Sequence, residues 1–347
     1  MNTRCLLVGM MMFLVPVALV FADQDDADSD AVVELVWPPK PLPTRIRYVG
    51  SIESPADVKP EQDKGFWARF WEVLHGPEEG NQAKPMAVVV DSKGRMSVVD
   101  PAGQQVHVYD QKEGDYRVIT DADLPLLLPI ALAIDDKDNL YVVDGMLQKV
   151  CVFSPDGDYL RSIGSADQLK RPTGIAIDTK RRLLYVVDTP QHDIKVFNLD
   201  DGSFRRIFGT HGRDAGEFNY PTYAAVDREG HLYINDTLNG RIQIFDQAGV
   251  FIREFGEFGD GGGDFSTAKG IAVDSDGNIY VADAGFDNLQ IFDPQGRLLL
   301  FIGTTGQAPG EFWTPTGLFI DNNDRLYVAD SFNKRVQIFQ YLKAGVK

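Results

Sequence analysis

The side chains most able to do chemistry in this chain of 347 residues are aspartates that recur at regular spacing. One aspartate ends an apolar segment, and a second ends the following segment nine residues later, or ten in the third copy. The first set is Asp91, Asp135, Asp178, Asp227, Asp274 and Asp321, and the second set is Asp100, Asp144, Asp188, Asp236, Asp283 and Asp330. One carboxylate per copy at a constant position is typical of hydrogen bonding in turns between strands. We therefore expect structural aspartates rather than a metal or acid–base ring.

Other candidate metal ligands and nucleophiles form no recognisable motif. The sequence AspSerAspGlyAsn at 274–278 resembles a calcium loop, but Ile279 and Gly285 stand where an EF-hand needs glycine and glutamate. Cys151 lies in the apolar run KVCVF, where a packed or half-exposed thiol is expected, and no GlyXSerXGly sequence is present. The five histidines fall in separate segments and are expected to lie apart: His75, His107, His192, His211 and His231. We predict no catalytic residue, no metal site and no cofactor.

A sequence repeat positions these residues, and it recurs six times between Pro85 and Tyr341. The second aspartates follow one another at intervals of 44, 44, 48, 47 and 47 residues. Such an interval accommodates four strands of about 5 to 6 residues with hairpin turns. Glycines in short turns, such as Gly230 and Gly277, support hairpins. The predicted fold class is all-β: a six-bladed β-propeller whose blades are four-stranded and antiparallel.

The sixth copy lacks its outermost strand, because the chain ends soon after the segment RVQIFQY at 335–341. The missing strand is found near the other end. RIRYVG at 45–50 matches the outermost strands FIREFG at 251–256 and YLRSIG at 159–164 position by position. We predict that residues 45–50 pair with residues 335–341, which closes the ring and removes an exposed sheet edge.

The repeated phrases PTGIAID, LYVVD and NxRIQIFD resemble NHL repeats, and the resemblance covers nearly all of the chain after residue 44. It is most specific at Asn239 with Arg241 and at Asn333 with Arg335. The first three copies depart from it, with Gly103, Leu147 and Gln191 in place of that asparagine. The resemblance implies a six-bladed NHL propeller of the type that bacteria export. Because one propeller scaffold hosts many activities, it implies no single function.

The N-terminal region predicts export. Arg4 precedes an apolar run from Cys5 to Phe21, and an acidic stretch follows Ala22, as in a secretory signal peptide at 1–22. A retained membrane anchor is the alternative; after cleavage no transmembrane span is expected, although peripheral membrane contact is possible. Residues 23–44 are predicted to be an acidic, proline-rich linker. The localisation expected is the periplasm or the exterior of the cell.

The propeller is predicted to cover residues 45–341, with a closing strand at 45–55, an insertion at 56–84 and blades from residue 85. Within the insertion, helical spacing predicts a helix at about 64–75. Its aromatic residues are candidates for capping the propeller or for docking onto a protein or membrane: Phe66, Trp67, Phe70 and Trp71.

Recognition is expected on the face that carries the turns between strands two and three and the connections between blades. The residues proposed to contact a partner there are Tyr220, Tyr223, Lys269, Phe286, Trp313 and Phe332. A net charge of −17 disfavours nucleic acid as the partner. The function predicted is binding or scaffolding of a protein or peptide. The alternative is a small-molecule hydrolase or lyase with a metal-dependent site at the propeller axis, because some propeller lyases hold zinc there with clustered histidines.

Overall fold

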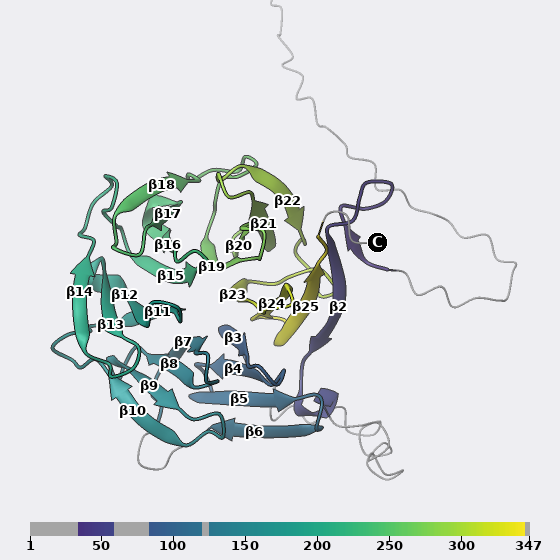
Figure 1. Cartoon of the computed structure of the whole chain (residues 1–347). Coiled ribbons are helices and arrows are strands. Elements are labelled where there is room, and N and C mark those ends of the chain that lie inside the picture. Colours follow the sequence, from purple (N-terminus) through teal and green to yellow (C-terminus); the bar gives the residue numbers. More distant parts are fainter. Residues whose placement is uncertain (1–33, 59–82, 120–124, 344–347) are drawn as a thin grey trace, which may run out of the picture. The chain divides into compact units, whose positions relative to one another are not determined.

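A computed structural model describes residues 34–58, 83–119 and 125–343 and shows a ring of six β-sheets around a central axis (Figure 1). The expected signal peptide and the expected helix, with Phe66, Trp67, Phe70 and Trp71, lie outside these ranges. Within the described ranges, no helix has the length and hydropathy needed to cross a bilayer.

Each of the first five blades consists of four consecutive strands, with the first innermost and the fourth outermost. Blade 1 comprises β3 (Ala87–Val90), β4 (Met96–Asp100), β5 (Gln105–Asp110) and β6 (Asp115–Ile119), and blade 2 comprises β7 (Pro129–Ile134), β8 (Leu140–Asp144), β9 (Lys149–Phe153) and β10 (Tyr159–Ile163). Blade 3 comprises β11 (Pro172–Asp178), β12 (Leu183–Asp188), β13 (Asp193–Asn198) and β14 (Phe204–Phe208). Blade 4 comprises β15 (Pro221–Val226), β16 (Leu232–Asp236), β17 (Arg241–Phe245) and β18 (Phe251–Phe255), and blade 5 comprises β19 (Ala268–Val273), β20 (Ile279–Asp283), β21 (Asn288–Phe292) and β22 (Leu298–Ile302).

Blade 6 combines the two ends of the propeller, as expected from the sequence. It contains β23 (Pro315–Ile320), β24 (Arg325–Asp330) and β25 (Arg335–Tyr341), and β2 (Ile46–Ile52) pairs antiparallel with β25. Ile46 lies opposite Tyr341, and Ile52 lies opposite Val336. The prediction of a ring closed by an N-terminal strand is confirmed. Short 3-10 helices lie at Pro55–Val58, Thr189–Gln191 and Thr237–Asn239.

Within the region predicted to be a linker, two residues form a short strand. β1 (Val36–Trp37) pairs with β2 and makes blade 6 five-stranded. The Trp37 ring meets the Phe339 ring edge-on at 5.7 Å between centroids, so the start of the described chain packs against the closing blade. Composition did not predict this contact, because a lone tryptophan among prolines carries no strand pattern.

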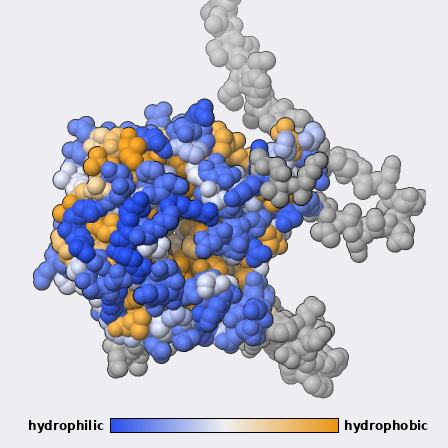
Figure 2. Space-filling view, in the orientation of Figure 1, coloured by the Kyte–Doolittle hydropathy of each residue, from blue (hydrophilic) through white to orange (hydrophobic). Residues whose placement is uncertain are grey.

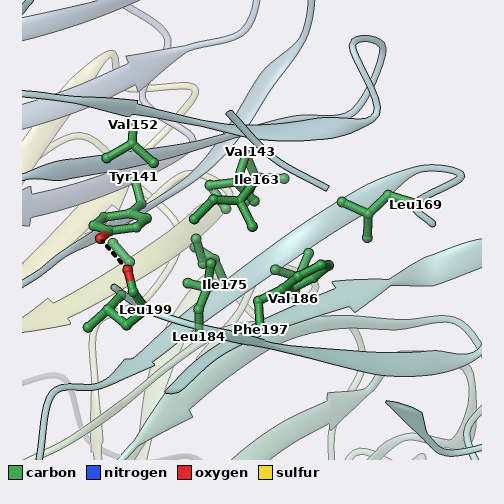
Figure 3. Close-up of a cluster of buried hydrophobic side chains, with 13 residues drawn as sticks. Tyr141, Val143, Val152, Ile163, Leu169, Ile175, Leu184, Val186, Phe197 and Leu199 are labelled. Carbon is green, nitrogen blue, oxygen red and sulfur yellow. Dashed lines mark hydrogen bonds between the residues drawn. The ribbon is translucent and has the colours of Figure 1, made fainter. Parts of the chain in front are cut away.

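The core lies between the blades, where apolar side chains from facing sheets interdigitate. Figure 3 shows the cluster between blades 2 and 3, in which Tyr141 and Val143 of β8 face Ile175 of β11 and Val186 of β12. Three phenylalanines at equivalent positions in the connections between blades are fully buried: Phe218, Phe265 and Phe312.

Candidate functional site

The second aspartate of each blade organises one face of the ring, which we call the loop face because it carries the strand two–three turns and the connections between blades. In blade 5, the carboxylate of Asp283 accepts the backbone N–H groups of Ser266 and Thr267, at 2.8 and 2.9 Å, from the incoming connection. It also accepts the N–H of Gly285 from its own turn at 2.9 Å. Asp144 makes the same contacts in blade 2. These aspartates are therefore structural, as predicted.

The first aspartate of each blade holds a hairpin turn on the opposite face, which we call the hairpin face. Asp274, for example, accepts the N–H groups of Asp276 and Asn278 at 2.9 Å each. The DSDGN segment is thus a hairpin turn rather than a calcium loop.

Trp313 and Phe332 form an aromatic ledge on the loop face. Their rings stack with centroids 5.5 Å apart, and the two side chains are 45% and 52% exposed. The ammonium of Lys84 lies 5.6 Å from the centre of the Phe332 ring, a cation–π arrangement. The structure thus brings together two of the six residues predicted for partner contact. Phe286 lies in the corresponding turn of blade 5 and is half-buried.

Tyr220 is exposed on the loop face and lies beside two histidines that were predicted to be far apart. The rings of His192 and His211, expected to lie apart, have centroids 4.4 Å apart, and Tyr220 meets His192 edge-on at 4.8 Å. Both histidines come from loops that meet at the junction of blades 3 and 4, a proximity that their separation in sequence concealed.

The histidine pair is poorly arranged for metal binding. The backbone N–H of Tyr220 donates to Nδ1 of His192 at 3.1 Å, so the neutral imidazole carries its proton on Nε2. Neither nitrogen of His192 then offers a free lone pair. Across the described ranges, no group of three or more His, Cys, Asp or Glu residues is placed to share a metal ion.

Tyr223, also predicted to contact a partner, points into the central channel. It is partly buried, and its hydroxyl reaches 3.6 Å from the sulfur of Met86, which belongs to the blade opposite. Burial raises the pKa of the Tyr223 phenol far above its usual value. The side chain therefore crosses the central channel at its loop-face end.

Lys269 stands at the start of the innermost strand β19, as predicted, and it is half-buried. Burial lowers the pKa of its amine, and the charge of Asp283 opposes that shift only in part. Asn235, at the end of β16, was missed by sequence reasoning although it is fully buried beside Lys269. An alignment of the six copies would have revealed Asn235 as an exception, because the other five copies carry valine or alanine at that position.

The channel has a volume of about 190 Å³ and is lined by residues of all six innermost strands, which are small or aliphatic except for Tyr223 and Phe319. Figure 2 shows the hollow at the centre of the ring, with hydrophobic residues in its wall. Toward the hairpin face it meets a polar hollow of about 360 Å³ whose lining includes Asp178, Lys180, Arg228 and Asp321. The charged residues of this hollow were not among the predicted site residues.

Family models match three segments of the chain. A model described as a six-bladed β-propeller matches residues 275–343, one described as an SMP-30/gluconolactonase/LRE-like region matches residues 144–257, and a β-propeller repeat model matches residues 250–282. Among curated proteins, NHL repeat-containing protein 2 from Bos taurus is 32% identical over 94 residues, and the Homo sapiens protein is 31% identical over 93. Each match covers 24% of this chain and only 13% of the relative.

Solved structures share the fold at low sequence identity. A streptogramin B lyase structure has a TM-score of 0.57 at 11% identity, covering 75% of this chain and 94% of that one. An auxiliary nutrient binding protein from Bacteroides ovatus has a TM-score of 0.58 at 12% identity, covering 74% of this chain and 69% of that one. At such identities the likeness shows the architecture alone. The repeat pattern and the six closed blades make this chain a six-bladed β-propeller, with segments similar in sequence to NHL-repeat proteins.

Proposed function

We propose that this protein is an extracytoplasmic binding or scaffolding propeller that recognises a protein or peptide partner through its loop face. The observation that carries the proposal is the set of large apolar side chains exposed on that face. They lie in strand two–three turns or in connections between blades: Met146, Tyr220, Leu238, Phe258, Trp313 and Phe332. Exposed aromatic and apolar residues of this kind are typical anchors of protein interfaces.

The aromatic ledge is the best-organised part of this surface. The backbone N–H of Trp313 donates to the buried carboxylate of Asp330 at 2.8 Å, and the N–H of Phe332 donates to the carbonyl oxygen of Trp313 at 3.1 Å. These bonds hold the two rings on a rigid support, so a partner pays little conformational entropy to use them.

The extracytoplasmic location rests on the sequence before the described ranges. The apolar run from Cys5 to Phe21, followed by acidic residues, supports a secretory signal. The net charge of −17 supports a protein or peptide partner over a nucleic acid.

The test is affinity capture from the source cells with three forms of the tagged full chain. The first is wild type, and the second carries Trp313→Ala and Phe332→Ala on the ledge. The third carries Leu299→Ala and Phe301→Ala on the outermost strand β22, whose side chains are 56% and 42% exposed and so match the ledge in apolar exposure.

We expect one partner to co-purify with wild type and with the β22 variant, and to be reduced at least about tenfold with the ledge variant, a loss of about 1.4 kcal/mol. Equal recovery with all three forms, at equal thermal stability, would reject the loop face as the binding surface.

A further inference from the structure

A tryptophan near the start of the described chain packs onto the outer edge of blade 6. β1 pairs antiparallel with β2, so that Trp37 lies opposite Ile46. The indole ring meets the Phe339 ring and lies so close to Gly310 that a Cβ there would contact it at 2.7 Å. The outermost strand of blade 6 thus carries an additional strand, whose aromatic side chain packs against a phenylalanine and a glycine.

The connection that leads into blade 5 repeats the one that leads into blade 6. The segments GEFGDGGGDF at 256–265 and GTTGQAPGEF at 303–312 align without a gap. Gly263 therefore takes the place of Gly310, and both glycines have a positive φ, of 95° and 80°. In the described part of the chain, a Cβ on Gly263 would meet nothing closer than 3.7 Å. The space that Trp37 fills in blade 6 is therefore open in blade 5.

The outermost strands of the two blades also correspond. In blade 5, Leu298 of β22 pairs with Phe292 of β21. In blade 6, Tyr48 of β2 pairs with Phe339 of β25, and the backbone N–H of Tyr48 donates to the carbonyl oxygen of Leu35 at 3.0 Å. Equivalent residues of antiparallel pairs point their N–H groups the same way, so the N–H of Leu298 faces outward. In the described ranges β22 pairs only with β21, which leaves its outer edge free (Figure 1).

A hollow of about 300 Å³ lies at this edge, and we call it the blade 5 hollow. Its lining consists of Phe292, Leu298 and four glycines, together with the acidic residues Glu257 and Asp264. Leu298 is smaller than Tyr48, the corresponding residue of blade 6, and the glycines contribute no side chains. An aromatic ring in this hollow would therefore contact a phenylalanine and a glycine, as the tryptophan does in blade 6.

Acidic residues around the hollow indicate the charge of its ligand. Glu257 and Asp260 are exposed, and Asp264 adds a third carboxylate. The residues of the blade 6 connection that align with the first two are uncharged: Thr304 and Gln307. Carboxylates at an open edge attract lysine and arginine side chains, and added salt weakens this attraction.

We propose that the free edge of β22 binds an extended peptide of another protein, whose tryptophan fills the blade 5 hollow and whose neighbouring residues are basic. Main-chain hydrogen bonds, including one from the N–H of Leu298, add the peptide as a strand, and the hollow selects its side chain. The peptide comes from another protein because the matching segment of this chain, residues 35–37, already lies on blade 6. The site goes beyond recognition through the loop face and is separate from the aromatic ledge.

The experiment measures binding of the synthetic peptide KLVWPPK to the purified full chain by isothermal titration calorimetry. The probe keeps the sequence of residues 35–40 and has lysine in place of Glu34. We expect replacement of its tryptophan by alanine to weaken binding at least about tenfold, a change of about 1.4 kcal/mol. Bound peptide should also slow amide hydrogen exchange in β22, because strand addition covers that edge.

Two variants of the protein test the hollow and its charge. Gly262→Phe should abolish binding, because a Cβ at this position meets Leu298 at 3.2 Å and the added ring occupies the hollow. The matched control is Ala215→Phe, which adds the same ring at the aligned, exposed position of the blade 4 connection.

Glu257→Thr with Asp260→Gln restores the uncharged pattern of blade 6. This double variant should weaken binding of the basic peptide about threefold to tenfold at low salt and reduce its salt dependence.

The ledge variant, Trp313→Ala with Phe332→Ala, should bind the peptide as wild type does, which separates this site from the proposed loop-face function. Leu299 and Phe301 lie outside the lining of the hollow and beyond the positions that the peptide pairs with. Their replacement by alanine should therefore also leave binding unchanged.

Three results would overturn the assignment. Equal affinity for the alanine peptide, or unchanged affinity after Gly262→Phe at wild-type thermal stability, removes the tryptophan site. Binding of N-acetyltryptophanamide as tight as that of the peptide removes strand addition. A dimer of the chain that the peptide dissociates assigns the hollow to a second copy.

Discussion

The hydroxyl oxygen of Tyr223 lies 3.6 Å from the sulfur of Met86, across the axis of the propeller. Tyr223 belongs to blade 4 and Met86 precedes the innermost strand of blade 1, and these blades face each other in the ring of six (Figure 1). Five small residues in the layer of Tyr223 leave the channel open, and this one side chain crosses it. The two ends of the channel therefore differ. The Tyr223 side chain crosses the end at the loop face, and a polar hollow lies at the hairpin face.

Removing only the hydroxyl, by Tyr223→Phe, should leave the protein as stable or slightly more stable. The hydroxyl is buried against a thioether sulfur, which is a weak acceptor, so its desolvation is poorly compensated. We expect the free energy of unfolding in urea to stay constant or to rise by up to about 1 kcal/mol. A decrease in the free energy of unfolding by more than about 1 kcal/mol would show that the hydroxyl has a stronger partner than Met86.

Trp37→Ala should weaken the closure of the ring. Besides its contact with Phe339, the Trp37 ring lies so close to Gly310 that a Cβ on that glycine would meet it at 2.7 Å. Truncating a large aromatic side chain in a packed position costs about 3 to 5 kcal/mol, and the partial exposure of Trp37 reduces the expected loss to about 2 kcal/mol. Thermal unfolding measures it, with Leu42→Ala, 59% exposed, as the control that should change nothing.

Asp330→Ala should be severely destabilising. The carboxylate is fully buried and contacts Nε of Arg335 at 2.8 Å, and Arg335 is itself 6% exposed. Removing one partner of a buried ion pair costs about 3 to 5 kcal/mol, because the other charge stays buried without compensation. Urea unfolding of this variant beside Asp276→Ala, an exposed turn carboxylate, gives the comparison. Similar losses in the two variants would contradict the structural role of the second aspartates.

His192 should make the protein less stable in acid. Burial, and then the proximity of His211, lower the pKa of His192 below its ordinary value of 6.5. The unfolded chain therefore binds the proton more readily than the folded chain. The resulting contribution is fully present above pH 6.5 and is lost as the pH falls from 6.5 toward the folded pKa.

The measurement is the free energy of unfolding of wild type and His192→Gln at about pH 7.5 and about pH 5.5. Wild type should lose stability relative to the variant at the lower pH. A constant difference between the two proteins at both pH values would exclude a shifted pKa at His192.

Cys151 should be inert to thiol reagents in the folded protein. Its side chain is fully buried, and burial raises the pKa of the thiol to about 11. Thiolate is the reactive form, so almost none is present near pH 8. In a Cys5→Ser chain, Ellman's reagent should find no thiol before denaturation and one afterwards. Rapid reaction of the native chain would show that blade 2 opens locally.

The aspartate spacing and the turn glycines predicted the number of blades, and the partner of the closing strand could be found by matching residues 45–50 to other outermost strands. Both inferences succeeded because every blade repeats the same order of strands. A segment that matches the outermost strands of other copies must therefore complete the copy that lacks one. Trp37 was missed because its contacts with Phe339 and Gly310 cross from one end of the chain to the other and follow no period.

The repeat pattern alone determined the architecture and the structural role of the aspartates, because alternation and turn chemistry are local properties. Only the tertiary structure decided that His192 meets His211, that Tyr223 spans the axis, and that Asn235 lies beneath Lys269. Those relationships depend on how blades face one another around a ring. A side chain's direction toward another blade is set by the packing of whole sheets, which no short stretch of sequence contains.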